Sequence, residues 1–367
     1  MNVWIDILHI PQLNFYKPFI GMLSERGHNV YITVLNRGKL SVIAKKELAD
    51  IPNVSISVVG KHRMKKWSVI LEANLLRLPQ LLCWAMGKHI DVAFSNGSHI
   101  GIVSQLYKFP AYEFEDDPQA ADYHLMVRYA TQNHSIIYEA TSQLDIEPKD
   151  KVLPVLKEWA YLNQKLFIPD VRSLREYAIE AHNYLFLREV SVGTLNYAEQ
   201  KSGAILSIVP EIQKVQALHP ELKVLLSLEE KYRRAEYPAD WILLQEPIKD
   251  IHSLIYYSAG LISSGDSMAR EAALLGVPAY YLGIRYDMPA NAAAAKVAQL
   301  QNQKTQSVAD WLHDILSVDI QTAEEKQQQL RNHIDKEFID INQYMLGLVE
   351  GVADSTCAKN AQVGLKE

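Results

Sequence analysis

Short apolar, β-branched runs alternate with helical patterns along almost the whole chain, and this alternation limits the possible folds more than any other feature. In the first half, the expected strands are Val3–Ile7, Val30–Leu35, Val54–Val59, Asp91–Ser95, Ala111–Phe114 and Ser135–Tyr138. In the second half, they are Tyr184–Arg188, Lys223–Ser227, Trp241–Leu244, Ala259–Ser263 and Pro278–Leu282. Amphipathic helix patterns lie between them, as in Phe15–Arg26. The alternation predicts parallel sheets that helices cover on both faces.

Chain length and proline distribution divide the sequence into parts. A chain of 367 residues is long for one core and fits two α/β domains of ordinary size. The stretch from Glu139 to His182 lacks clear strands and contains Pro148, Pro154 and Pro169, so it is the expected inter-domain connection. We therefore expect domains at residues 1–165 and 166–320, a C-terminal helix within residues 321–350, and a disordered tail at residues 351–367.

One strand–turn–helix segment, Ser263–Pro278, suggests a binding site. Small residues follow an apolar strand, and a helix-forming segment begins near Asp266. The first N–H groups of a helix lack partners and lie at the positive end of its dipole, so such a turn can hold a phosphate. Glu271 lies about one and a half turns into this helix, where a carboxylate could reach the sugar hydroxyls beside a diphosphate. An ordinary helix between two strands, ended by Gly276, fits the same spacing.

Charge and cysteine content exclude several classes of protein. The formal net charge is −6, so the chain as a whole is not built to bind nucleic acid, and any anion site must be local. The two cysteines, Cys83 and Cys357, argue against a disulfide framework and favour a reducing compartment. No signal-peptide pattern precedes the first strand, and polar residues interrupt the most apolar stretch, Val69–Met86. We therefore expect a cytoplasmic protein.

The motifs of several common enzyme classes are absent from the sequence. There is no G-x-G-x-x-G after the first strand, no P-loop, no H-E-x-x-H and no G-x-S-x-G. The twelve histidines are scattered without the spacing of metal ligands. We therefore expect neither a metal ion nor a redox cofactor.

The residues of Ser263–Pro278 also resemble a known donor site. The segment is similar to that of GT-B glycosyltransferases of the MurG type, in which a glycine-rich turn is followed six residues later by a glutamate. More closely, "SMAREAALLGVPA" at residues 267–279 resembles the family catalogued as domain of unknown function 354, a GT-B-like group. The resemblance continues in "NVWIDI" and "KPFIGMLSERGHNVYITV" within residues 2–34, "AFSNGSHIG" at 93–101 and "LKEWAYL" at 156–162. It covers most of residues 1–320.

The resemblance implies a fold and a reaction. GT-B proteins have two Rossmann-like, doubly wound parallel-sheet domains that face a cleft, and a C-terminal helix that crosses back to the first domain. The implied activity is metal-independent transfer of a sugar from a nucleotide-diphosphate donor, expected to be UDP-linked, to a glycan or lipid-linked acceptor of the cell envelope or of a polysaccharide. Two alternatives stay open. One is a UDP-sugar epimerase or hydrolase related to the non-hydrolysing UDP-N-acetylglucosamine 2-epimerases, and the other is a non-catalytic GT-B protein.

The donor would be bound mainly by the C-terminal domain. The expected binding residues of the turn and its helix are Ser264, Gly265, Asp266, Ser267, Met268 and Glu271. Arg188, at the end of its strand, could clamp the diphosphate, or it could pair with Glu189 or Glu230 on the surface. The related epimerases have a His-Arg pair at this point, and no histidine precedes Arg188, which weighs against epimerase chemistry. Ile248 lies in a loop that contacts the base in GT-B proteins.

Two strand ends of the N-terminal domain offer candidates for the general base. The first strand ends in Asp6-Ile7-Leu8-His9, and in GT-B enzymes the loop after it, here expected to reach Asn14, meets the acceptor. His9 or Asp6 could take the acceptor proton there. Alternatively, Asp6 hydrogen-bonds loop amides and His9 is a satisfied partner. Glu115-Asp116-Asp117 follows another strand; because Asp117 fits a helix N-cap, Asp116 is the preferred base.

A turn at the end of a further strand is expected on the acceptor side. Asn96, Gly97 and Ser98 either cradle a ligand there or form an ordinary capped turn. The sequence also departs from the related family, whose Pro-His pair is Pro11-Gln12 here and whose Glu and His after the acid are Pro118 and Gln119. These differences keep the non-catalytic alternative open.

Residues 60–89 are basic within an acidic chain. Six basic side chains against one acidic side chain give a local charge of +5. Apolar residues are interleaved with them, namely Trp67, Leu71, Leu75, Leu78 and Trp84. A basic helix with an apolar face could rest on anionic lipid, which predicts peripheral contact with the inner face of a membrane. A solvated flank above a core-facing helix explains the same pattern.

Overall fold

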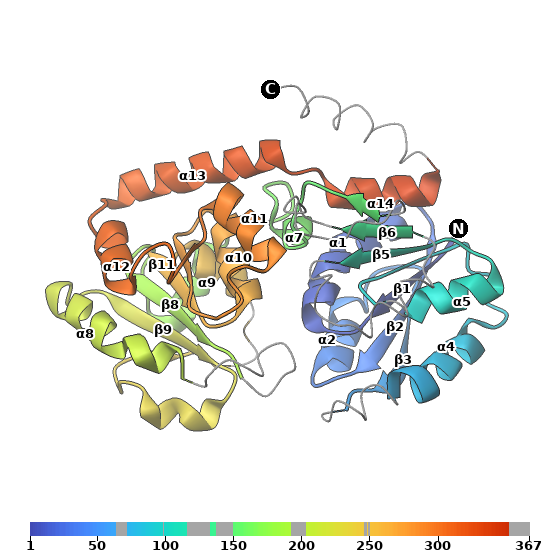
Figure 1. Ribbon diagram of the computed structural model, residues 1–367, viewed down its shortest axis with the longest axis horizontal. Helices are drawn as coiled ribbons and strands as arrows, with labels where there is room; N and C mark the ends of the chain where they lie inside the picture. The colour runs from blue at the N-terminus through green and yellow to red at the C-terminus, as the bar shows by residue number, and fades with distance from the viewer. Residues whose placement is uncertain are drawn as a thin grey trace. The chain divides into compact units, whose positions relative to one another are not determined.

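The computed structural model describes residues 1–63, 72–97, 99–115, 133–136, 150–191, 203–245, 248 and 250–351. The chain forms two compact units. One consists of Met1–Tyr161 together with the C-terminal residues from Ile339, and the other of Leu162–Phe338. Each unit is built on its own parallel sheet (Figure 1). The predicted tail at residues 351–367 lies outside the described residues, apart from Gly351.

In the described residues, the first unit has a seven-stranded sheet in the order β3-β2-β1-β4-β5-β6-β7. Its strands are β1 (Asn2–Ile7), β2 (Asn29–Asn36), β3 (Val54–Lys61), β4 (Val92–Ser95), β5 (Ala111–Glu115), β6 (Asn133–Ile136) and β7 (Asp150–Val152). The helices are α1 (Ile10–Glu25), α2 (Leu40–Glu47), the π-helix η1 (Glu72–Arg77), α4 (Leu78–Ala85), α5 (His99–Tyr107), α7 (Trp159–Leu162) and α14 (Ile341–Glu350). α1 covers one face of the sheet, and α4 and α5 cover the other (Figure 1).

The coverage of both faces explains why the strands are apolar runs rather than alternating patterns. In β1, every side chain from Val3 to Ile7 is buried. On one face, the rings of Phe19 of α1 and Phe94 of β4 lie 5.1 Å apart. On the other face, those of Trp4 of β1 and Trp84 of α4 lie 5.2 Å apart.

A buried ion pair joins the end of β1 to η1. Arg77 donates to Asp6 twice, over 2.6 Å to Oδ1 and 3.1 Å to Oδ2. Thr33 of β2 donates to the same Oδ1 over 2.6 Å, and the guanidinium also donates to the Val59 carbonyl of β3. Both charged side chains are almost fully buried. Such a pair repays its desolvation only when further hydrogen bonds satisfy both groups, as they do here.

The second unit has a sheet in the order β10-β9-β8-β11-β12-β13 over the residues that are described. Its strands are β8 (Tyr184–Glu189), β9 (Lys223–Leu228), β10 (Ile242–Leu243), β11 (Gly260–Ser263), β12 (Ala279–Tyr281) and β13 (Gln301–Asn302). The helices are η2 (Val171–Tyr177), η4 (Ile205–Ile208), α8 (Val209–Leu218), η5 (Lys231–Glu236), α9 (Ile251–Tyr256), α10 (Asp266–Leu274), α11 (Pro289–Ala298), α12 (Val308–Leu316) and α13 (Ile320–Glu337). α8 and α12 pack on one face, and α10 lies on the other (Figure 1).

Every predicted strand overlaps an observed one, and among the described residues two short strands were not predicted. These are β7 and β13, whose sequences, Asp-Lys-Val and Gln-Asn, carry no apolar run. The first helix begins at Ile10, five residues before the predicted start at Phe15. Pro11 fits the first turn of this helix, and the Gln12 side chain accepts from the Leu8 N–H over 2.7 Å. The helix therefore begins almost directly after the strand.

The predicted C-terminal helix is two helices. Phe338 is extended, Ile339 donates to the Pro154 carbonyl over 3.2 Å, and Asp340 caps α14 by accepting from the N–H groups of Asn342 and Gln343. α14 packs on α1 (Figure 1), and Asn342 donates to the Ala160 carbonyl. The expected return of the C-terminal helix to the first unit is therefore confirmed for α14, whereas α13 belongs to the second unit. Nowhere in the described ranges is a helix both long and apolar enough to cross a bilayer.

Candidate functional site

The strand order of each sheet reverses at one point. In the second unit it reverses between β8 and β11, and in the first unit between β1 and β4. Open parallel sheets bind ligands in the crevice beyond the carboxyl ends of the strands at such a point. The turn after β11 and Arg188 of β8, whose Cα pairs with that of Ser263, lie at the first of these points. His9 and Asn96, which follow β1 and β4 closely, lie at the second.

The predicted turn after β11 is tightly fixed. Gly265 is the N-cap of α10, and the Ser263 hydroxyl accepts from its N–H over 3.0 Å. A Cβ on Gly265 would lie 2.5 Å from Cγ1 of Val190, so any side chain there would have to displace that valine. The buried Ser264 hydroxyl accepts from the Val190 N–H over 2.9 Å. Ser263, Ser264 and Gly265 therefore shape the turn, as expected of a strand–turn–helix site.

The helix after the turn is mostly buried and ends where the sequence predicted. Ser267 and Met268 are the partly exposed residues of its first turn. Gly276 follows its end with φ +73°, and a Cβ there would lie 2.5 Å from the Gln327 carbonyl oxygen of α13. Asp266, the first helical residue, accepts from the Ser267 N–H over 2.9 Å. Its carboxylate thus already occupies the helix N-terminus.

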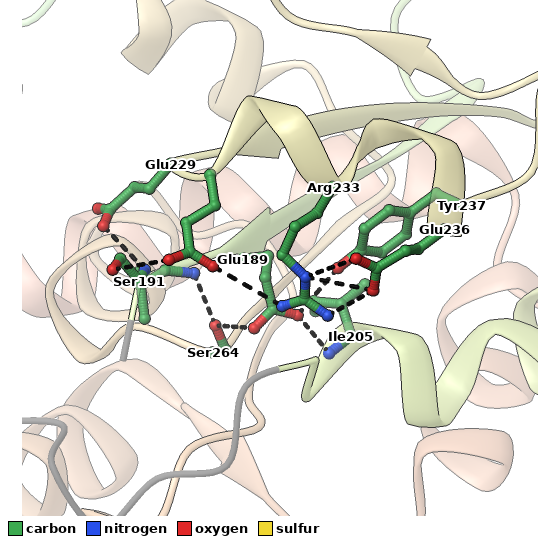
Figure 2. A network of polar contacts seen from close by, with 10 residues as sticks. Glu189, Ser191, Ile205, Glu229, Arg233, Glu236, Tyr237 and Ser264 are labelled. Carbon is green, nitrogen blue, oxygen red and sulfur yellow. Dashed lines mark hydrogen bonds and ion pairs between the residues drawn. The ribbon is translucent and has the colours of Figure 1, made fainter. Parts of the chain in front are cut away.

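Glu189, at the end of β8, links three segments around the turn (Figure 2). Its buried carboxylate accepts from the Ile205 N–H over 2.7 Å, the Ser264 hydroxyl over 3.2 Å and the Tyr237 hydroxyl over 3.3 Å. Burial raises the pKa of Glu189, and these hydrogen bonds and the charge of Arg233 oppose that rise. The sequence named Glu189 only as a surface partner of Arg188. It is a buried residue that positions the turn.

Arg188 is paired with neither of its expected partners. Its guanidinium donates to Glu229 over 2.6 Å and to the Ser227 hydroxyl of β9 over 2.8 Å. Glu229 also accepts from the Ser191 N–H over 2.9 Å (Figure 2). The arginine lies at the expected strand end, with its charge matched by a carboxylate.

Glu271 is buried on α10 and contacts a histidine that the sequence did not single out. The Oε1 of Glu271 lies 3.4 Å from Nε2 of His252 on α9. Burial alone lowers the pKa of His252, but the carboxylates of Glu271 and Asp250 outweigh it and raise the pKa above its usual value. A histidine at this point orients the carboxylate. Only proximity in the fold reveals this, because 19 residues separate the pair.

Of three further predicted site residues, the structure describes only Ile248. Ile248 is partly exposed after β10, between residues that are not described. Ser98 and Asp116, the preferred base, lie outside the described residues. Their roles stay predictions.

In the first unit, Asp6 cannot serve as a base in this arrangement, because Arg77 and Thr33 take both of its oxygens. The expectation that Asp6 binds loop amides is likewise wrong. His9 is the partly exposed N-cap residue of α1, directly after the strand rather than within a longer loop. Asn96 donates to the Phe114 carbonyl of β5 over 2.6 Å, and the Gly97 N–H donates to the Ser95 hydroxyl. These contacts give the turn after β4 its shape.

Two buried residues of the first unit, Glu113 and Tyr16, were not predicted from the sequence. Glu113 of β5 is buried. Burial, together with the carboxylates of Glu113 and Asp6, raises the pKa of Tyr16 on α1 well above its usual value. Within the described ranges, no cluster of three or more His, Cys, Asp or Glu side chains is placed to hold a metal ion.

Comparison with known proteins defines the fold class. No family model matches the sequence, and no curated protein matches it. The structure is similar to UDP-GlcNAc 2-epimerase from Neisseria meningitidis bound to UDP-GlcNAc, with a TM-score of 0.67 and 13% identity over 96% of this chain and 100% of that one. It is also similar to the spinosyn rhamnosyltransferase SpnG complexed with thymidine diphosphate, with a TM-score of 0.60 and 14% identity over 95% and 100%.

A third similar structure is the glycosyltransferase of kitacinnamycin, with a TM-score of 0.64 and 12% identity over 96% of this chain and 98% of that one. Together with the two parallel-sheet units, these similarities confirm the predicted GT-B fold. Identities this low establish the fold alone.

The raised pKa of His252 makes stability depend on pH. The unfolded histidine titrates near pH 6.5, so the stabilisation from the protonated pair is fully present below about pH 6.5 and is lost as the pH rises through the folded-state pKa. The free energy of unfolding lost in His252→Gln should therefore shrink between about pH 6 and pH 9 in urea titrations. His333→Gln, at an exposed site on α13, is the control. A loss that is the same at every pH would contradict the pairing.

Proposed function

We propose that the chain is a GT-B glycosyltransferase that binds a nucleotide-diphosphate sugar beyond the carboxyl ends of β8 and β11. The observation that carries the proposal is Glu271. This buried carboxylate lies one and a half turns beyond the N-terminus of α10, and His252 orients it. A carboxylate so placed can accept hydrogen bonds from ribose hydroxyls while the helix N-terminus faces the diphosphate. Similar structures that hold UDP-GlcNAc and thymidine diphosphate support this class of ligand.

Residues of the turn after β11 would supply most of the remaining donor contacts. Ser264 and Gly265 would set its shape, and Ser267 and Met268, the partly exposed residues, would face the phosphates with Asp266 beside them. Ile248 would contact the base, and we expect the donor to be UDP-linked. We also propose membership of the domain-of-unknown-function-354 family, on the motif at residues 267–279.

In the proposed reaction, an acceptor hydroxyl attacks the anomeric carbon of the donor. The bond between that carbon and the diphosphate oxygen breaks, and the nucleoside diphosphate leaves with the electron pair. Asp116 or His9 takes the acceptor proton. Asn96, Gly97 and Ser98 would contact the acceptor, a glycan or lipid-linked sugar. The helix dipole and Arg188 would stabilise the leaving group, so no metal is required.

The donor site is tested by Glu271→Gln. Loss of the charge-assisted hydrogen bonds to ribose should weaken UDP binding by about 1–3 kcal/mol in calorimetry. Glu325→Gln, at an exposed site on α13, should bind UDP as the wild type does. Unchanged UDP affinity in a folded Glu271→Gln variant would remove the donor-site assignment.

The epimerase alternative is favoured by one specific observation, the similarity to the Neisseria meningitidis enzyme. Incubation with UDP-GlcNAc in the absence of an acceptor separates the two functions. A transferase should leave the sugar nucleotide essentially unchanged over hours, whereas an epimerase or hydrolase converts it within minutes. Proton NMR of the anomeric signals measures both outcomes. Rapid conversion without an acceptor would replace the proposed transferase with the alternative.

We further propose that the first unit contacts a membrane through the segment of residues 60–89 and the adjoining α5. The most exposed of the described apolar side chains there are Leu75 of η1 at 65%, Met86 after α4 at 65% and Leu106 of α5 at 63%. The surface charge is lower than the sequence suggested, because Arg77 is buried in an ion pair with Asp6. Arg63 pairs over 3.0 Å with Glu72, the acidic residue already counted in the local charge. Residues 64–71 lie outside the described residues.

Vesicle sedimentation tests this contact. Wild-type protein should bind anionic vesicles at low salt and less at high salt, because each basic residue near the surface contributes about 1 kcal/mol and salt screens it. Leu75→Glu/Met86→Glu should lower binding at least about fivefold, since it removes the apolar anchors and adds negative charge. Leu218→Glu, at an exposed leucine of α8, is the control. Equal binding by the double variant and the wild type would contradict the proposal.

A further inference from the structure

One glutamine of α13 bridges the ends of the two helices that carry His252 and Glu271. The Gln327 side-chain amide donates to the carbonyl of Tyr256, the last residue of α9, over 3.0 Å. It also donates to the carbonyl of Leu275, the C-cap of α10, over 3.1 Å. The last carbonyls of a helix lack partners within that helix, and an amide group has two N–H donors, one for each of these carbonyls. The buried side chain of Gln327 therefore joins α9 to α10.

The bridged carbonyls lie at matching places on the two helices. Tyr256 follows His252 by four residues, and Leu275 follows Glu271 by four residues. Four residues make about one helical turn, so each carbonyl lies about one turn beyond a member of the pair. On α10, the Leu275 N–H closes this turn by donating to the Glu271 carbonyl over 3.0 Å. Gln327 thus connects the turn that carries His252 to the turn that carries Glu271.

Two features of the surrounding structure hold Gln327 in this place. Gly276, after the end of α10, has φ +73°, and a Cβ there would lie 2.5 Å from the Gln327 carbonyl oxygen. The glycine therefore allows α13 to approach α10 closely. One turn further along α13, Cζ of the buried Arg331 lies 5.3 Å from the centre of the Tyr256 ring, and its guanidinium donates to the Leu162 carbonyl over 3.2 Å. α13 is thereby fixed against both helices.

The contact between His252 and Glu271 is sensitive to the spacing of these helices. The distance of 3.4 Å between Nε2 and Oε1 is close to the limit for a hydrogen bond, so a small separation of α9 from α10 would break it. We propose that Gln327 is a positioning residue of the donor site, which holds α9 and α10 at the spacing that this contact requires. The inference rests on the proposed function, in which Glu271 accepts hydrogen bonds from ribose.

A role through Glu271 has a consequence that a merely structural role lacks. Without the two amide donors of Gln327, the helix ends lose their common partner, and Glu271 holds ribose less well. Once the Glu271 carboxylate is itself removed, the loss of Gln327 should no longer change nucleotide binding. The two substitutions should therefore be non-additive in the free energy of UDP binding.

A double-mutant cycle, measured by UDP calorimetry on the full-length chain, tests the assignment. Gln327→Met keeps the length of the side chain but removes both donors, and it should weaken UDP binding about 3- to 10-fold, the effect of losing a hydrogen bond. In a Glu271→Gln background, the same substitution should change UDP affinity by less than about twofold. Gln329→Met, at an exposed glutamine of the same helix, is the matched control and should bind UDP as the wild type does.

Two further variants separate positioning from a general loss of stability. Val308→Ala, in the core on the opposite face of the sheet, should destabilise the second unit but leave the UDP affinity of the folded protein unchanged. Gln327→Asn keeps the amide but draws it back by one methylene, and it should weaken UDP binding at least about twofold. This variant keeps the test decisive if Gln327→Met does not fold.

The outcomes separate this inference from the function on which it rests. A folded wild-type protein that binds neither UDP nor thymidine diphosphate overturns the donor site and the role of Gln327 together. If Glu271→Gln weakens UDP binding but neither substitution of Gln327 does, only the role of Gln327 is overturned. Equal losses from Gln327→Met in the wild-type and Glu271→Gln backgrounds also overturn it, because Gln327 would then act independently of Glu271. An equal loss of affinity in folded Val308→Ala does the same, because the effect would then come from stability alone.

Discussion

The buried Glu189 carboxylate is the interaction on which the candidate donor site depends. The adjacency of β8 and β11 brings the end of one strand beside the turn that follows the other. Glu189 then connects that turn, through Ser264, to the Ile205 N–H at the start of η4 and to Tyr237 after η5. A buried carboxyl group is costly without partners, so its three hydrogen-bond donors must stay in place together. The turn, and with it the direction of α10, is thereby fixed before any ligand binds.

The two units stabilise a buried acid at the reversal of strand order in different ways. In the first unit, a guanidinium neutralises Asp6, and this ion pair ties η1 to the sheet. In the second unit, neutral donors surround Glu189, and the arginines lie on either side of the turn, Arg188 with Glu229 and Arg285 with Asp266. In the first arrangement, the charge of the Arg77 guanidinium is neutralised within the core. The second keeps its arginines partly exposed, each beside a carboxylate.

Much of the fold and part of the site could be predicted from local sequence. The turn at Gly265 and the helix from Asp266 were predicted because small residues, a helix start and an ending Gly276 are neighbours in the chain. The contacts of Glu189, His252 and Arg285 could not, because their partners are 75, 19 and 19 residues away. Asp6 was assigned wrongly for the same reason, since Arg77 is 71 residues distant.

The sequence by itself determined the two parallel sheets, since buried strands that helices cover on both faces must be short apolar runs separated by amphipathic segments. It also determined the position of the turn after β11, which depends on residues adjacent in the chain. Only the tertiary structure decided which charges lie beside one another near that turn. The packing of β8 beside β11, and of the β12–α11 loop against α10, pairs Arg188 with Glu229 and places Arg285 beside Asp266. Charge balance depends on distances across the fold, which spacing along the chain does not encode.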